Sequence, residues 1–138
     1  MITQHFFTGI QRLPTGILLH RLTSRSLNGD YNPLHASDQV GRQMGFGGLI
    51  LHGLFTYSSA CHGLLRSFCK SDASRLKEFQ ARFASPVRPT DKLVTEMWRM
   101  GVIDGAEEVR FRTINQKRRV VLSNGRALLS REGVKAAL

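Results

Sequence analysis

The chain has 138 residues, of which 41% are hydrophobic and 22% are charged, as is typical of a soluble globular protein. This length leaves little room for a second domain, so we expect residues 1–138 to form one domain around one core. Twenty Lys and Arg residues against ten Asp and Glu residues give a net charge of +10. A field of this sign attracts polyanions such as nucleic acid, acidic lipid headgroups or a phosphorylated cofactor.

The two ends of the chain carry no clear targeting signal. The start, MITQHFFTGI, lacks a charged region and a long apolar core, so we expect no signal peptide. The longest apolar run, residues 45–55, is interrupted by Gly and His and is too short to span a bilayer. The final KAAL matches the peroxisomal import tripeptide poorly. We therefore expect a cytoplasmic or peroxisomal protein that does not bind a membrane.

Three segments have helical patterns. Residues 17–27 fit a short helix, and residues 37–44 fit another, with Ser37 as N-cap and Gly45 at the stop. Residues 49–69 have apolar side chains at helical spacing and few charges. A long helix that is apolar almost all round is usually buried, so this segment predicts a buried central helix.

Both cysteines, Cys61 and Cys69, fall in that central helix. Eight residues of helix separate them by about 12 Å, which is too far for a disulfide. Two free thiols are therefore expected, in a reducing compartment.

Four runs with alternating or β-branched character follow the helix. They are predicted to be strands and cover residues 76–87, 91–100, 107–115 and 118–130. Turn residues separate them at 88–91, 101–105 and 116–118. One face carries Phe79, Ala81 and Phe83 on the first strand, and Val109, Phe111 and Thr113 on the third. The pattern predicts an antiparallel meander with one dry and one wet face, wrapped around the long helix: an α+β fold.

The stretch NGDYNPLHASD, residues 28–38, places an acid and an imidazole on constrained backbone. Asn28-Gly29 is a turn signal, and Pro33 fixes its own φ and pushes Asn32 into an extended conformation. Asp30 and His35 can converge on one water as a general acid/base pair, because imidazole titrates near neutrality. The Asn32 carboxamide can orient a carboxylate, a water or a substrate carbonyl.

A second motif, ILHGL at residues 50–54, stands at the start of the predicted central helix. A helix N-terminus offers unpaired N–H groups and a positive dipole end. Gly53 permits close approach of a ligand to the backbone, so its N–H can hold a developing oxyanion. His52 beside it is interpreted as a helix-start residue and not as a proton carrier.

These two motifs, followed by ARFASPVRPTDKLVTEMW at 81–98, resemble the MaoC-like or hydratase 2 family within the hot-dog fold superfamily. The resemblance covers about residues 20–128. It implies a curved antiparallel sheet wrapped around a long central helix. The family contains (R)-specific 2-enoyl-CoA hydratases, including the hydratase 2 domain of peroxisomal multifunctional enzyme type 2, whose C-terminal half this chain is similar to.

The resemblance also implies an activity. Asp30 and His35 would hold and activate a water, Asn32 would support them, and the Gly53 N–H would bind the thioester carbonyl. The reaction would be syn addition of water to a trans-2-enoyl thioester, giving the (R)-3-hydroxyacyl product, or its reverse. It would need no metal and no cofactor, with a coenzyme A or acyl-carrier thioester as substrate. A hot-dog thioesterase is a rival that the motif argues against.

Related double hot-dog proteins place a second half beside this segment, so a partner is expected here, and we predict a homodimer. The alternative to an enzyme is a non-catalytic hot-dog subunit or an acyl-carrier binding module. Two settings fit the enzyme: fatty-acid oxidation, and polyketide-type secondary metabolism.

The remaining candidates are weaker. Residues 115–121, NQKRRVV, form a charged hairpin turn or attract the phosphates of coenzyme A. They have no aromatic neighbours for base stacking, so no nucleic-acid partner is expected. No His, Cys or acidic residues have metal-ligand spacing, so no metal is expected. Tyr57 and Ser58 line the acyl site or simply pack in the core.

Overall fold

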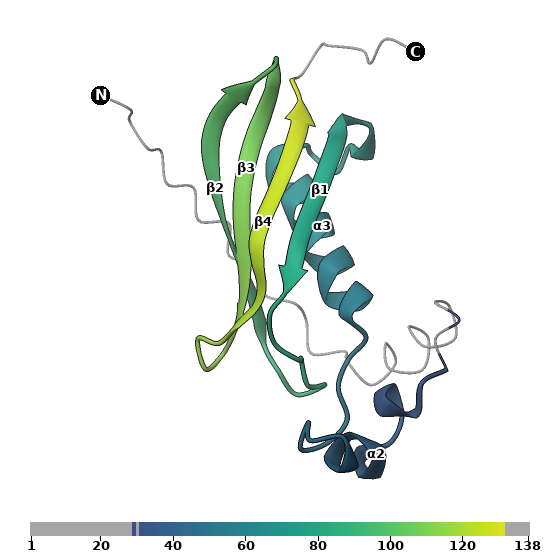
Figure 1. Ribbon diagram of the computed structural model, residues 1–138. Coiled ribbons are helices and arrows are strands. Elements are labelled where there is room, and N and C mark those ends of the chain that lie inside the picture. Colours follow the sequence, from purple (N-terminus) through teal and green to yellow (C-terminus); the bar gives the residue numbers. More distant parts are fainter. Residues whose placement is uncertain (1–28, 30, 132–138) are drawn as a thin grey trace.

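In the part of the chain that the structure describes, a four-stranded antiparallel sheet and one long helix form two layers (Figure 1). The computed structural model describes residue 29 and residues 31–131. The predicted helix at 17–27 therefore lies outside the described residues. The helices and 3₁₀ turns are η1 (Pro33–His35), α2 (Asp38–Gln43), α3 (Gly53–Phe68) and η2 (Ala73–Arg75). The strands are β1 (Leu76–Phe83), β2 (Leu93–Ile103), β3 (Ala106–Asn115) and β4 (Val120–Ser130), in the spatial order β1-β4-β3-β2.

The four predicted strands and the α+β class are confirmed, but their bounds differ from the prediction. β1 ends at Phe83 and not at residue 87, and β4 begins at Val120 and not at residue 118. Residues 101–103 were predicted to be part of a turn, but they belong to β2. Only Asp104 and Gly105 make the turn, both with positive φ, at 50° and 77°. Two residues of this kind match the right-handed twist of the flanking strands, so the hairpin closes tightly and the strands run longer than predicted.

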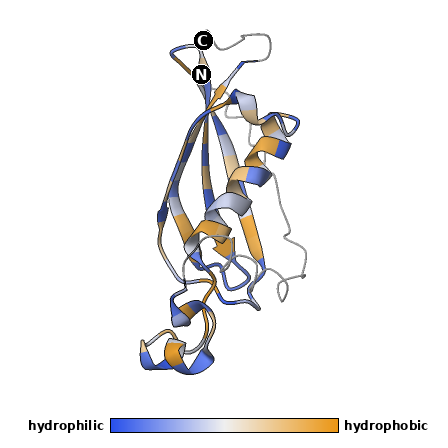
Figure 2. Ribbon diagram, turned by 90° about the vertical axis from the view of Figure 1, so that its right-hand side faces the viewer, coloured by the Kyte–Doolittle hydropathy of each residue, from blue (hydrophilic) through white to orange (hydrophobic). Residues whose placement is uncertain are grey.

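The central helix begins later than predicted. It starts at Gly53 and not at residue 49, because the His52 side chain accepts a hydrogen bond from the Leu54 N–H at 3.2 Å and caps the helix. The predicted burial of this helix is confirmed along one face only. One face, which carries the buried residues Thr56, Ala60, Gly63, Leu64 and Phe68, packs on the sheet (Figure 2). A single sheet can bury only one stripe of a helix, and Leu54 is 47% exposed.

The core lies between the two layers. Leu64 of α3 is fully buried against Met97, Val109, Leu122 and Leu129 of the sheet. The predicted dry face is confirmed for most of its members: Val109, Phe111 and Thr113 are buried, and Phe79 and Ala81 pack against the same cluster. The exception is Phe83, which is 54% exposed at the end of β1. The Phe79 and Phe111 rings stack with centroids 4.8 Å apart.

The opposite face of the sheet is charged. Arg126 of β4 donates to Glu78 of β1 at 2.6 Å and to Glu108 of β3 at 2.8 Å. Arg110 also pairs with Glu108 at 2.8 Å. The hydrogen bond from the Arg126 guanidinium lowers the pKa of the Glu108 carboxyl below its ordinary value. Strand alternation thus confirms the predicted wet face and covers it with cross-strand ion pairs.

Both cysteines are free thiols, as predicted. Burial raises the pKa of Cys61 and of Cys69, which makes both poor nucleophiles. Among the described helices, none is long and apolar enough to cross a bilayer.

Candidate functional site

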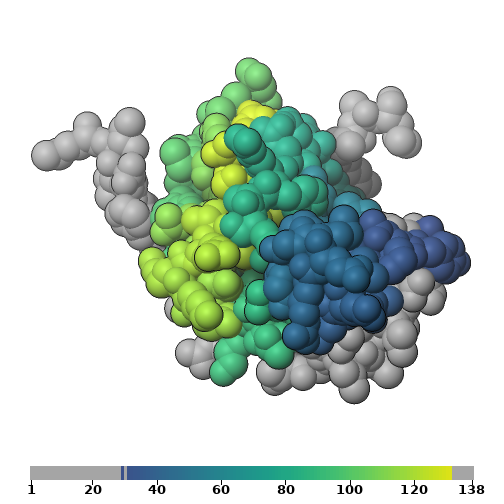
Figure 3. Space-filling view, turned by 60° about the horizontal axis from the view of Figure 1, so that its bottom comes forward, coloured from purple at the N-terminus to yellow at the C-terminus, as the bar shows by residue number. Residues whose placement is uncertain are grey.

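The predicted motif residues lie in a segment that extends beyond the N-terminal end of α3. This η1–α2 segment, residues 31–52, stands below the sheet in Figure 1 and is blue on the lower face of the molecule in Figure 3. Its first turn is η1, with Pro33 at the first position. Asn32 is extended, with φ −57° and ψ 122°, as the following proline predicts. Its Oδ1 accepts a hydrogen bond from the Leu34 N–H at 3.0 Å and so caps the turn that carries His35.

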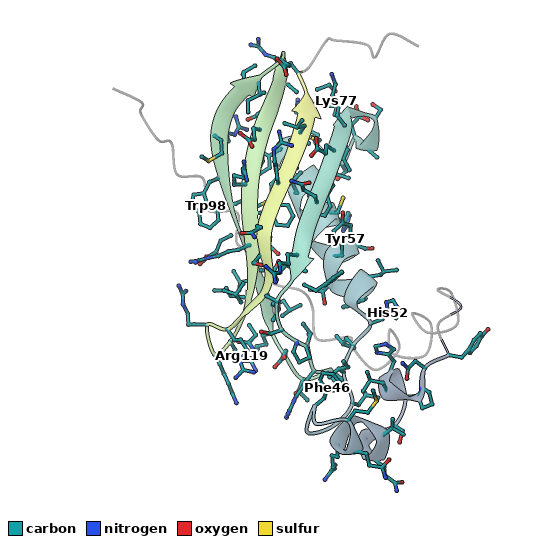
Figure 4. All side chains as sticks on the ribbon, viewed as in Figure 1. Phe46, His52, Tyr57, Lys77, Trp98 and Arg119 are labelled. Atoms are coloured by element: carbon teal, nitrogen blue, oxygen red, sulfur yellow. The ribbon has the colours of Figure 1, made fainter. Side chains whose placement is uncertain are left out.

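His35 is held in one ring orientation. Its Nδ1 lies 3.1 Å from the carbonyl oxygen of Ile50. Because a carbonyl oxygen only accepts hydrogen bonds, Nδ1 carries the proton and the lone pair of the neutral ring is on Nε2. The His35 and His52 rings lie with centroids 4.9 Å apart (Figure 4). Since His52 Nδ1 accepts from the Leu54 N–H, His52 has the opposite tautomer and the helix-start role that we predicted.

Contacts of α2 fix the stretch of chain that supplies the Ile50 carbonyl. Asp38 Oδ1 accepts a hydrogen bond from the Leu49 N–H at 2.9 Å. Gly41 packs directly on the backbone of Gly48: a Cβ at Gly41 would lie 2.0 Å from the Gly48 carbonyl oxygen. The sequence analysis missed these two positioning residues. A glycine inside a predicted helix was the available signal, because it lowers helix propensity without a local reason.

His35 and Gly53 line one cavity of about 300 Å³, together with Ile50, Thr56 and Phe83. Gly53 is the first residue of α3, where the backbone N–H groups have no partner within the helix. A Cβ at Gly53 would lie 3.0 Å from the Phe83 ring, so a larger residue would press on this wall of the cavity. The rest of the lining is mainly apolar, which suits an acyl chain beside a polar reaction centre.

The structure therefore brings together two of the four predicted site residues, His35 and Gly53. Asp30 lies outside the described residues. Asn32 does not line the cavity but holds the turn that positions His35. Tyr57 packs instead of lining the cavity: its hydroxyl donates to the Phe79 carbonyl at 2.6 Å. Ser58 does not line it either. Within the described part of the chain, no three His, Cys, Asp or Glu side chains are grouped to hold a metal ion.

Comparison with known proteins gives one family. The model of the MaoC like domain matches residues 22–121. A probable dehydratase of Ajellomyces capsulatus is 46% identical over 124 residues, which cover 81% of this chain and 33% of the relative. A probable enoyl-CoA hydratase 2 of Dictyostelium discoideum is 39% identical over 106 residues, 76% of this chain and 35% of the relative. The chain thus spans about a third of the length of these two relatives.

A solved structure has the same architecture. The crystal structure of a MaoC-like dehydratase from Phytophthora capsici superposes with a TM-score of 0.77 at 28% sequence identity. The match covers 96% of this chain and 42% of the other. The predicted hot-dog fold is confirmed by this likeness together with the antiparallel sheet and its helix.

Proposed function

We propose that this chain, which belongs to the MaoC-like domain family, adds water to a trans-2-enoyl thioester or removes it from a (R)-3-hydroxyacyl thioester. The observation that carries this proposal is that His35 and Gly53 line the same cavity. Hydration of a conjugated thioester needs a group that exchanges a proton with water and a donor that stabilises the enolate oxygen. Relatives named as a dehydratase and as an enoyl-CoA hydratase support this reaction class.

In the proposed reaction the thioester carbonyl oxygen accepts a hydrogen bond from the Gly53 N–H. Asp30 and His35 hold one water between them. As the water oxygen bonds to C3, its proton passes to the pair, and the carbonyl oxygen becomes an enolate oxygen. The pair then gives a proton to C2 on the same face, which completes a syn addition. The reverse sequence removes water, and both directions leave Asp30 and His35 in their starting protonation states.

Asn32 is a positioning residue in this proposal. Its side chain fixes the turn of residues 33–35, and the Ile50 carbonyl fixes the ring of His35 in the tautomer with its lone pair on Nε2. Both contacts arrange the imidazole before substrate binds. Preorganisation of this kind lowers the barrier because no rearrangement is required during the reaction.

We also propose that the active form is a homodimer. β1 is an edge strand of the described sheet, its last residue Phe83 is 54% exposed, and Leu54 of α3 is 47% exposed. An unpaired strand with neighbouring apolar side chains is suited to pairing with a second copy. The rival is a non-catalytic subunit or an acyl-carrier binding module. It would keep the fold but show no turnover alone.

We further propose that residues 1–138 form one domain, that the substrate is a coenzyme A or acyl-carrier thioester, and that no metal or other cofactor takes part. The protein acts in the cytoplasm or the peroxisome. It serves fatty-acid oxidation or the tailoring of polyketide-like intermediates.

The test is hydration of trans-2-enoyl-CoA substrates of several chain lengths, followed as loss of the conjugated thioester absorbance. Asp30→Asn and His35→Gln should each lower kcat by at least about 100-fold. Asp104→Asn is the matched control, since it makes the same chemical change in the β2–β3 turn. Asp104 has φ 50°, a conformation that asparagine also adopts readily. No turnover by a folded wild-type dimer at any chain length would refute the enoyl-CoA hydratase and favour the non-catalytic subunit.

A further inference from the structure

Residues 53–55 supply the first three N–H groups of α3, and His52 occupies two of them. The Leu54 N–H donates to His52 Nδ1 at 3.2 Å, and the Phe55 N–H donates to the His52 carbonyl at 3.0 Å. Within the part of the chain that the structure describes, the Gly53 N–H has no acceptor. A helix N-terminus ordinarily leaves several N–H groups unpaired. Here His52, at the N-terminal end of α3 in Figure 4, leaves a single one of these three open.

The open donor and an unpartnered hydroxyl belong to the same cavity. Gly53 and Thr56 both line the cavity of His35. Thr56 is 3% exposed, and its hydroxyl has no hydrogen-bond partner among the described residues. Residues three apart lie on the same face of a helix, so both groups belong to one side of α3. Buried polar groups in proteins are normally paired. Two unpaired groups at this end of the cavity therefore indicate a ligand that carries a hydrogen-bond acceptor, such as a carbonyl oxygen.

The backbone is anchored on both sides of Gly53. Before it, the Leu51 N–H donates to the Val87 carbonyl at 2.7 Å. After it, the Leu54 N–H is held by the side chain of His52, whose backbone is extended with φ −63° and ψ 133°. Helix ends fray where their N–H groups are not capped. Without the His52 side chain, the turn that carries the Gly53 N–H would lose its second anchor while Leu51 stayed in place.

We propose that His52 is a positioning residue that presents the Gly53 N–H to the carbonyl oxygen of the thioester. This inference rests on the proposed function. The role requires only that Nδ1 of the neutral ring accepts a hydrogen bond. A rival role is proton exchange with His35, since the centroids of the two rings lie 4.9 Å apart. Asparagine separates the two roles, because its side chain caps a helix as well as any residue but does not titrate.

The first experiment measures kcat and KM for hydration of a trans-2-enoyl-CoA by the full chain. The cap variant is His52→Ala, the rescue variant is His52→Asn, and the control is His62→Ala, which makes the same change at an exposed position of α3. The cap variant should lower kcat about ten- to a hundredfold with little change in KM, because the enolate oxygen gains its charge only in the transition state. The rescue variant should stay within about threefold of the wild type, and the control should match it. A rescue variant as slow as the cap variant, or a cap variant as fast as the wild type, would overturn the proposal.

The second experiment follows the Gly53 amide proton by NMR while butyryl-CoA, a saturated thioester that cannot be hydrated, is added at saturating concentration. A new hydrogen bond to the carbonyl oxygen should shift this signal downfield in the wild type and in the rescue variant, and much less in the cap variant. No shift in a wild type that turns over enoyl-CoA would refute the positioning role while leaving the hydratase intact. The expected pattern of shifts without turnover of any enoyl-CoA would support the positioning role while refuting the hydratase.

Discussion

Replacing Gly41 by alanine should distort the site, although helix propensity alone predicts that alanine stabilises α2. Gly41 lies inside α2, and glycine to alanine in a helix interior normally stabilises by about 0.5–1 kcal/mol. Here the new Cβ would stand 2.0 Å from the Gly48 carbonyl oxygen and 2.3 Å from its carbon. That contact must lengthen to at least 3.0 Å, and it involves backbone on both sides. Overpacking of this kind costs about 1–3 kcal/mol, so the loss exceeds the gain.

The displacement should reach His35, which we propose to be catalytic. Gly48 is followed by Leu49, whose N–H is bound by Asp38, and then by Ile50, whose carbonyl orients His35. A shift of about 1 Å in a catalytic group can lower a rate about 100-fold. We therefore expect kcat for enoyl-CoA hydration to fall by roughly that factor in Gly41→Ala, with faster amide hydrogen exchange across residues 38–50.

Gln43→Ala is the control, since it adds no atoms at an exposed position of the same helix. It should keep the wild-type rate and exchange pattern. A Gly41→Ala protein as active as the wild type, or one with slower exchange over residues 38–50, would refute the reasoning. The exchange measurement keeps the test independent of the proposed function.

Two further predictions concern stability. Because Arg126 lowers the pKa of Glu108 in the folded state, the stabilisation from this carboxylate is complete above its ordinary value of 4.5 and is lost as the pH falls through the lower folded value. In urea titrations near neutrality, the free energy of unfolding of the wild type should thus exceed that of Glu108→Gln by about 1–3 kcal/mol, and this difference should shrink in acid. A difference independent of pH would contradict this. The Thr56 hydroxyl is buried and has no hydrogen-bond partner among the described residues. Thr56→Val, which keeps the shape, should therefore raise the unfolding free energy by about 1–2 kcal/mol, and a lower melting temperature would show that the hydroxyl is paired.

The sequence predicted features whose cause lies within a few residues. Alternation located the strands, and Ser37 caps α2 by accepting from the Val40 N–H, as its position before an amphipathic run indicated. The conformation of Asn32 followed from the proline after it. The resemblance carried by residues 28–38 and 50–54 predicted the family, because a reaction centre requires particular residue types at fixed spacing.

The sequence analysis was least accurate where a local pattern allowed two outcomes. The helical periodicity of the apolar residues extends back to residue 49. The helix nevertheless begins at Gly53, because the His52 side chain caps it there. Periodicity also could not say which stripe of α3 is buried, since apolar residues surround much of the helix. The buried face of α3 is set by the sheet, which packs against Ala60 and Leu64 and leaves Leu54 exposed.

Only the tertiary structure determined the contacts between distant parts of the chain. The Ile50 carbonyl that orients His35 is 15 residues away, and the Phe46 carbonyl that fixes Arg88 is 42 residues away. Neither contact has a sequence pattern, because any residue can supply a backbone carbonyl. The same holds for Gly41 against Gly48. The sequence by itself determined the strands, caps and reactive groups, whereas packing determined which of those groups face the same cavity, because that depends on how distant segments meet in space.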